Sequence, residues 1–295
     1  SRTWRLNWPV CTKTVQLDML HILSLGAGVQ SSAMALMAAK GELEPMPDCA
    51  IFADTGAEPW RVYDQVEYLE EIVPFPIYTV MEDEGLEKSI IDSIRDGKDK
   101  RGRFASAPFY TESPNAKGML RRQCTNEFKI KPIQKKIREL VGLKKGQRGP
   151  KEVVVSQWIG ISLDEAVRMK PNQTPWIENR WPLIEKELHR HDCLKWMEEN
   201  GYPKPGKSAC YFCPYSDNKT WQDMKTNDPR SFGLATKIDN LIRDGAHKTK
   251  EGKQYLHLTK LYLHRTRQPI DEVDFDPDRD QFDMFGNECE GLCGV

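Results

Sequence analysis

Four of the eight cysteines in this chain have a spacing that suits a metal centre. Cys210 and Cys213 form a Cys-x-x-Cys turn, in which two thiolates can bind one metal ion without strain. A pair supplies only half of a tetrahedral site, and Cys124 and Cys193 would complete an all-thiolate set. These residues predict a [4Fe-4S] cluster, with a structural zinc ion as the second interpretation. A redox-active dithiol formed by Cys210 and Cys213 is a third.

Two further cysteines stand near the end of the sequence. Cys289 and Cys293 lie in the run Asn-Glu-Cys-Glu-Gly-Leu-Cys-Gly-Val, where glycines stand beside the thiols. Thiols on a mobile tail can reach into a site and withdraw, which suits a sulfur relay. We therefore predict a catalytic role for Cys289 and Cys293. The alternative is an ordered tail whose cysteines pack or complete a metal site.

A loop of small residues suggests where a phosphate would bind. Residues 24–32 read Ser-Leu-Gly-Ala-Gly-Val-Gln-Ser-Ser and separate an apolar, strand-like run from a strong helix former at 33–40. Glycines let the backbone approach an anion, serine hydroxyls can donate to its oxygens, and a helix N-terminus adds a positive dipole end. The predicted phosphate-binding residues are Ser24, Gly26, Ala27, Gly28, Gln30, Ser31 and Ser32. An ordinary strand–helix turn is the alternative.

Two more strand ends carry small or polar residues. A buried-type strand at 49–54 runs into Asp54, Thr55 and Gly56, and a later strand ends near Gly160. Ligands bind at the carboxyl ends of parallel strands near a topological switch point. These four residues are therefore predicted to line one crevice for a nucleotide, and Asp54 is also a predicted catalytic residue.

The segment after Gly160 adds charged groups. Asp164 or Glu165 could hold Mg²⁺, and Arg168 could clamp a phosphate or sulfate with two hydrogen bonds. Arg168 is therefore a predicted catalytic residue. The alternative is a capped surface helix with an ion pair one turn apart.

The elements that must position these residues follow from the apolar pattern. Residues 19–80 alternate strand and helix, which predicts an α/β fold with a parallel, twisted sheet and flanking helices. Beyond them we expect a helix at 86–94, a lid loop at 98–118, an amphipathic helix at 126–140, a strand at 152–161, and a helical, loop-rich remainder from Trp176 on. The predicted parts are an arm (1–18), a nucleotide-binding domain (19–185), a cysteine-containing part (186–265) and a tail (266–295).

Composition limits the function classes. The net charge is −1, so the whole chain gives no argument for nucleic acid, although local basic runs occur between Arg121 and Lys145. No stretch is long and apolar enough to span a membrane, and no export signal is recognisable. We therefore expect a cytoplasmic protein that does not contact membranes, in which cysteines serve as ligands or reactive thiols rather than in disulfides.

Taken in order, the motifs resemble the PP-loop superfamily, and within it the phosphoadenosine phosphosulfate (PAPS) reductase-like branch. The resemblance covers about residues 20–215. The family loop Ser-Gly-Gly-Lys-Asp-Ser-Thr is similar to residues 26–32, with Ala27, Val29 and Gln30 where the family has Gly, Lys and Asp. The other matching segments are 54–56, Cys124 with 129–132, 160–168 (with Ser162 where Arg is usual), 182–183 with Trp196, and Cys210 with Cys213. Cys293 and Gly294 resemble the family's C-terminal Cys-Gly, without its preceding Glu and following His.

The resemblance implies an adenine nucleotide alpha-hydrolase-like fold and an ATP-dependent enzyme of sulfur transfer. ATP would be cleaved between its α and β phosphates with Mg²⁺, and sulfur would come from a donor such as a cysteine desulfurase. The pattern looks most like phage and prophage reductase-like proteins and the enzymes of DNA phosphorothioation, so DNA or tRNA is the implied acceptor, with the basic stretch 121–145 as its landing surface.

Two other functions remain open. The first is a PAPS or APS reductase that releases sulfite through Cys293 with a thioredoxin-like reductant. The second is a non-catalytic nucleotide-sensing subunit of a phage-defence complex, favoured by the altered loop at Ala27, Val29 and Gln30.

Overall fold

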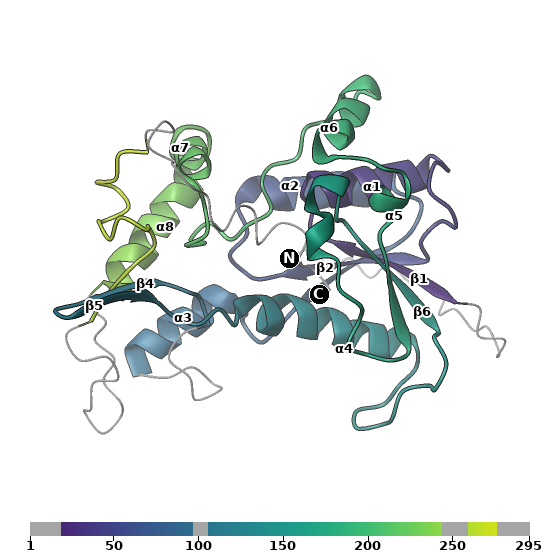
Figure 1. The fold of residues 1–295 in the computed structure, drawn as a ribbon, viewed down its shortest axis with the longest axis horizontal. Coiled ribbons are helices and arrows are strands. Elements are labelled where there is room, and N and C mark those ends of the chain that lie inside the picture. The colour runs from purple at the N-terminus through teal and green to yellow at the C-terminus, as the bar shows by residue number, and fades with distance from the viewer. Residues whose placement is uncertain (1–18, 97–105, 244–258, 276–295) are drawn as a thin grey trace, which may run out of the picture.

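A computed structural model describes residues 19–96, 106–243 and 259–275. Five parallel strands form the central sheet in the order β3-β2-β1-β6-β7 (Figure 1). Their bounds are β1 Leu20–Leu25, β2 Cys49–Asp54, β3 Ile77–Met81, β6 Val155–Ile159 and β7 Ile177–Arg180. The chain moves from β1 outward to β3 and then returns to the other side of β1. This arrangement confirms the predicted α/β fold with a parallel sheet.

Helices cover both faces of the sheet. One face carries α1 (Val29–Ala39), α2 (Trp60–Ile72), α5 (Pro182–Glu185) and α6 (Arg190–Glu199). α1 is buried over nearly its whole length, and after the polar first turn it is apolar on all sides, as a helix enclosed by the protein must be. The opposite face carries α4 (Lys131–Leu140), which continues a π-helical turn (Asn126–Ile130) and packs Ile133 and Ile137 on the strands. The helix predicted at 126–140 is therefore confirmed.

A second core lies beside the sheet. It contains α3 (Gly85–Asp96), α7 (Asn218–Asn227) and α8 (Pro229–Ile242), together with a small antiparallel sheet in the order β5-β4-β8 (Figure 1). These strands are β4 Tyr110–Ser113, β5 Ala116–Met119 and β8 Lys260–Tyr262. Phe109, Phe128 and Trp221 are fully buried in this core. None of the described helices is both long and apolar enough to cross a membrane.

Two elements differ from the sequence predictions. Residues 110–118 of the expected lid loop form, with Met119, the β4–β5 hairpin, and Pro114 and Asn115 make its two-residue turn. The region from Trp176 on, expected to be helical and loop-rich, begins with the strand β7, which extends the sheet beside β6. β4 and β7 are each only four residues long and rich in polar side chains. The alternation of apolar and polar residues in them is therefore too short to predict a strand.

Candidate functional site

The loop between β1 and α1 is held in one conformation by its own hydrogen bonds. The Gly26 N–H donates to Ser31 Oγ (3.2 Å), and the Ser208 hydroxyl donates to the Gly26 carbonyl. Ala27 adopts a φ of 55°, a left-handed conformation that costs roughly 1–2 kcal/mol for a residue with a Cβ. Gly28 packs closely on Ser208, since a Cβ at Gly28 would lie 3.3 Å from Ser208 Cβ and would push that residue away slightly. The loop is therefore closely packed, and at Ala27 its backbone adopts a conformation that a residue with a Cβ disfavours.

This loop has the donors that an anion needs. Gly28 provides no side-chain cap for α1, so the first-turn N–H groups remain available at the positive end of the helix dipole. The Ser32 hydroxyl is fully buried and has no hydrogen-bond partner among the described residues. A buried hydroxyl without a partner is costly, and a phosphate oxygen would satisfy it.

The carboxyl end of β2 lies beside this loop and is equally ordered. Asp54 Oδ1 accepts hydrogen bonds from the Gly56 N–H (2.7 Å) and the Tyr63 hydroxyl (2.9 Å). Burial and the Asp54 carboxylate raise the pKa of Tyr63, so this hydroxyl stays protonated and donates. Asp54 Oδ2 has no hydrogen-bond partner among the described residues, which leaves one carboxylate oxygen available at the strand end.

The end of β6 closes the crevice on the other side. Gly160 approaches α1 so closely that a Cβ would lie 3.1 Å from the Ser31 nitrogen. Because β1 leads to β2 on one side and β6 lies on its other side, this edge is the topological switch point of the sheet. The structure therefore brings residues 26–32, Asp54, Gly56 and Gly160 to one edge, as the sequence indicated.

Gln30 has a different environment from the other loop residues. Its amide Nε2 donates to Ser162 Oγ (3.4 Å) and Glu165 Oε2 (3.3 Å), and its Oε1 accepts from the Arg190 guanidinium (2.9 Å). Both ends of the side chain are thus engaged within the protein. Gln30 fastens the segment after β6 to α1.

Arg168 and Ser24 also have protein partners. Arg168 forms an ion pair with Glu165 (2.7 Å), one turn apart in a short 3₁₀ helix, Leu163–Arg168. Ser24 accepts a hydrogen bond from the Gln157 amide (2.7 Å) within the buried sheet. Asp164 accepts from the Arg190 N–H.

A pocket beside Thr55 brings three of the predicted metal ligands together. Its walls include Thr55, Cys124, Lys129, Cys210 and Cys213. The space between them has room for a water molecule rather than for a nucleotide. Thr55 Oγ1 lies 3.4 Å from Cys210 Sγ, so this strand end touches both the crevice and the thiols.

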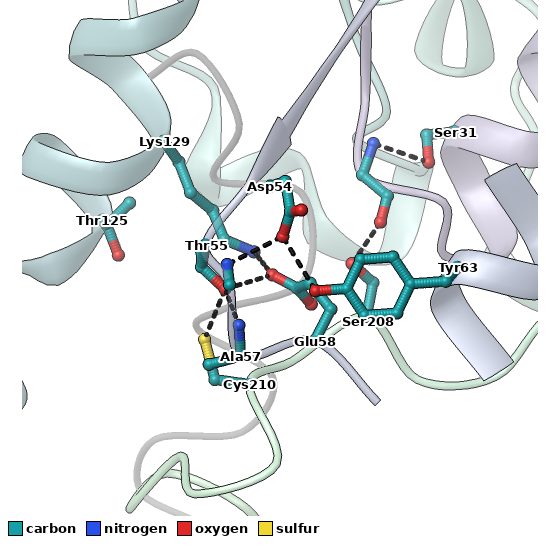
Figure 2. A network of polar contacts seen from close by, with 12 residues as sticks. Ser31, Asp54, Thr55, Ala57, Glu58, Tyr63, Thr125, Lys129, Ser208 and Cys210 are labelled. Atoms are coloured by element: carbon teal, nitrogen blue, oxygen red, sulfur yellow. Dashed lines mark hydrogen bonds and ion pairs between the residues drawn. The ribbon is translucent and has the colours of Figure 1, made fainter. Parts of the chain in front are cut away.

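A buried ion pair forms the polar side of this pocket. Lys129 Nζ lies 3.1 Å from Glu58 Oε1, and the two side chains are 7% and 0% exposed. Thr55 Oγ1 donates to the same carboxylate oxygen at 3.0 Å. Figure 2 shows Glu58, Lys129 and Cys210 gathered around Thr55, with Asp54 between this group and Ser31 and with the Tyr63 hydroxyl directed toward Asp54. Burial and the Glu58 carboxylate raise the pKa of the Cys210 thiol.

The fourth predicted ligand lies elsewhere. Cys193 is on α6, fully buried in the apolar core against α1, and burial raises its pKa to about 12. Across the described ranges, no group of three or more His, Cys, Asp or Glu side chains is arranged to hold a metal ion. The described thiols therefore do not fit a four-cysteine cluster or zinc site that includes Cys193. Cys289 and Cys293 lie outside the described residues.

Three residues of the site were not named as functional by sequence reasoning. Glu58 follows the Asp-Thr-Gly segment, and Lys129 was grouped with a basic run on a predicted helix. Their ion pair depends on the packing of the π-helical turn against the end of β2. Ser208 lies 182 residues from Gly26, and no local signal marks it.

The fold and the site together define an α/β chain with helices on both faces of a parallel sheet, a small-residue loop at the carboxyl edge of that sheet, and a thiol-lined pocket beside it. No family model and no curated protein matches the sequence. Among solved structures, the chain is similar to phosphoadenylyl-sulfate (PAPS) reductase from Candida auris in a phosphate complex. The match has 17% identity and a TM-score of 0.40, and it covers 63% of this chain and 74% of that chain.

Proposed function

We propose that this chain is a nucleotide-dependent enzyme of sulfur transfer. It binds ATP in the crevice, cleaves it between the α and β phosphates, and activates an acceptor oxygen as its adenylate. One observation carries the proposal: Thr55 stands between the anion-binding crevice and the thiol pocket, 3.4 Å from Cys210 Sγ. A phosphate site and a thiol group that share one strand end suit an enzyme that activates an acceptor and then delivers sulfur.

The proposed chemistry proceeds in two balanced steps. The acceptor oxygen attacks the α-phosphorus, and pyrophosphate leaves as its bond to that phosphorus breaks. The loop N–H groups, Ser31 and Ser32 stabilise the charge that develops on pyrophosphate. The outer sulfur of a persulfide then attacks the activated centre, AMP leaves with the oxygen, and a disulfide joins carrier and acceptor. A thioredoxin-like dithiol reduces that disulfide, which frees the carrier thiol and leaves the sulfur on the acceptor. Cys289 or Cys293 is the proposed persulfide carrier, loaded by a cysteine desulfurase, and DNA or tRNA is the proposed acceptor.

Mg²⁺ is a proposed cofactor of the crevice. At nucleotide sites this ion is held by one or two carboxylates and by phosphate oxygens. Asp54 fits such a role, because its Oδ1 is engaged by Gly56 and Tyr63 while Oδ2 is available. Bound Mg²⁺ would supply Lewis-acid stabilisation of phosphate charge. No step is assigned to an iron–sulfur cluster, since the described thiols do not fit one.

The test is formation of AMP and pyrophosphate from ATP and Mg²⁺. Ser32→Ala and Asp54→Asn should each lower the rate by about 100-fold, the cost of losing one group that stabilises developing charge. Ser113→Ala, an exposed hydroxyl in the β4–β5 hairpin, is the matched control and should keep the full rate. Sulfite released from PAPS with a thiol reductant, without AMP formation from ATP, would show that the chain is a reductase instead.

A second candidate is a nucleotide sensor without turnover. The engagement of Gln30 by Ser162, Glu165 and Arg190 favours it, because this side chain serves the protein rather than a ligand. Tight ATP binding without any product, unchanged in Cys293→Ser, would support the sensor over the enzyme.

A further inference from the structure

One surface of the protein is strongly basic although the chain as a whole is not. Residues 131–151 contain eight Lys or Arg and one acidic residue, whereas the net charge of the chain is −1. Six of these cations are exposed on α4 and on the segment after it, and we call them the basic face: Lys131, Lys135, Lys144, Lys145, Arg148 and Lys151. Such a concentration of charge produces a local positive potential despite the near-neutral total.

The charge of the basic face is not neutralised within the protein. Among the described residues, none of its six cations lies within ion-pairing distance of a carboxylate. The neighbouring Lys136 differs, since it pairs with Glu139 (2.9 Å) and lies over the Tyr78 ring. The basic face therefore keeps its full charge for a partner.

The loop that extends the basic face is fixed to α4. Arg138 donates to the carbonyls of Lys144 and Gln147, and the Leu143 N–H donates to the Arg138 carbonyl at 2.8 Å. Lys144 N–H also donates to Gln147 Oε1 at 3.0 Å. These bonds fix the loop around Lys144 and Lys145 against the end of α4, so little ordering of this part is needed when a polyanion binds.

We infer that the basic face binds the phosphate backbone of a nucleic-acid duplex. The inference rests on the proposed function, because it identifies where a nucleic-acid acceptor would dock. No exposed aromatic side chain lies on this face among the described residues, and Lys136 covers Tyr78. Single strands are usually held by stacking on aromatic rings, whereas duplexes are held through their phosphates.

The position of the basic face agrees with this role. Lys131 begins α4 two residues after Lys129, which lies in the thiol pocket. α4 then runs along the sheet face opposite α1 and α2 (Figure 1). A duplex on the basic face would therefore pass the thiol pocket at one end.

The experiment compares two triple charge reversals with equal net charge. The test variant is Lys135→Glu with Lys144→Glu and Lys145→Glu, and the control is Lys195→Glu with Lys219→Glu and Lys237→Glu, exposed lysines of α6, α7 and α8. The probe is a labelled DNA duplex of about 20 base pairs, titrated at several salt concentrations. The test variant should lose at least about tenfold in affinity near 0.1 M salt, and its salt slope should fall by about one unit per lysine. The control should bind like the wild type.

Three results would overturn the inference: equal losses in both variants, salt-independent binding, or tighter binding of a single strand of the same length. ATP turnover is measured on the same proteins to separate the two proposals. Loss of duplex binding in the test variant alone, with ATP turnover intact in both variants, supports the basic face. Duplex binding without any ATP turnover in the wild type contradicts the proposed enzyme and leaves the basic face supported.

Discussion

Cys193 and Cys210 belong to one predicted ligand set, yet they lie in opposite surroundings. Cys193 is fully buried in apolar packing between α6 and α1. Burial raises the pKa of both thiols, so the contrast lies in the groups that surround each one. Cys210 lies 3.4 Å from the Thr55 hydroxyl and beside the Glu58–Lys129 pair. The comparison teaches that the chemical role open to a cysteine depends on where the fold places it relative to the carboxyl edge of the sheet. Only the second thiol reaches the carboxyl edge of the sheet, where ligands bind.

The two regions also differ in how they are stabilised. The core around Cys193 depends on apolar packing, in which each contact contributes only a small amount to the free energy of unfolding. The pocket around Cys210 depends on a buried ion pair, whose two members compensate each other and are costly if separated. The polar region is therefore the more fragile one when a single group is removed.

The largest expected effect comes from breaking that ion pair. Lys129→Ala leaves the Glu58 carboxylate buried without its counter-ion, and we expect the free energy of unfolding to fall by about 3–5 kcal/mol. Urea unfolding gives the value. Lys136→Ala, about two helical turns further along, is the matched control, because its pair with the largely exposed Glu139 is worth less than about 1 kcal/mol.

A double variant sharpens this prediction. Glu58→Gln combined with Lys129→Met removes both charges and keeps similar volumes, so most of the lost stability should return. If the double variant is as unstable as Lys129→Ala alone, the cost comes from lost packing and not from an unpaired charge.

An intermediate effect concerns His264, which is 2% exposed in the second core. Burial lowers its pKa from 6.5 to about 4, and its ring nitrogens contact Asn218 and Thr266. The unfolded chain takes up this proton first as the pH falls. Stability from neutral His264 is therefore complete above pH 6.5 and is lost toward pH 4, by about 3 kcal/mol in total.

Urea unfolding at several pH values checks this. His264→Gln should flatten the loss between pH 6.5 and 4, while His191→Gln, an exposed histidine on α6, should leave it unchanged. An unaltered profile in His264→Gln would mean that water reaches this ring and that the second core is less closed than the core around Cys193.

Much of the crevice could be predicted from the sequence. The apolar run before Gly26, the small residues of the loop and the helix former after it are local signals, and each corresponds to an observed element. The Asp54–Gly56 segment was identifiable for the same reason. Local sequence patterns are enough to predict a site segment that consists of one strand, one turn and one helix in succession.

The rest depends on contacts between distant segments. Glu58 and Lys129 meet only because a π-helical turn packs on β2, and Ser208 reaches Gly26 from the connection between α6 and α7. Neither contact has a spacing that sequence reasoning could detect. The prediction that Cys193 joins the other cysteines was wrong for the same reason. The apolar face of α6 packs on α1 and keeps Cys193 in that core.

The smallest expected effect compares serine substitutions at the two thiols. Cys193→Ser places a hydroxyl in apolar packing and should cost about 1–2 kcal/mol, whereas Cys210→Ser keeps a hydrogen bond with Thr55 and should cost much less. Urea unfolding measures both. Iron and zinc analysis of anaerobically purified protein then separates their roles: any bound metal should be retained in Cys193→Ser and lost in Cys210→Ser. Loss of metal from both variants would restore the four-cysteine set and show that α6 leaves α1 when the metal binds.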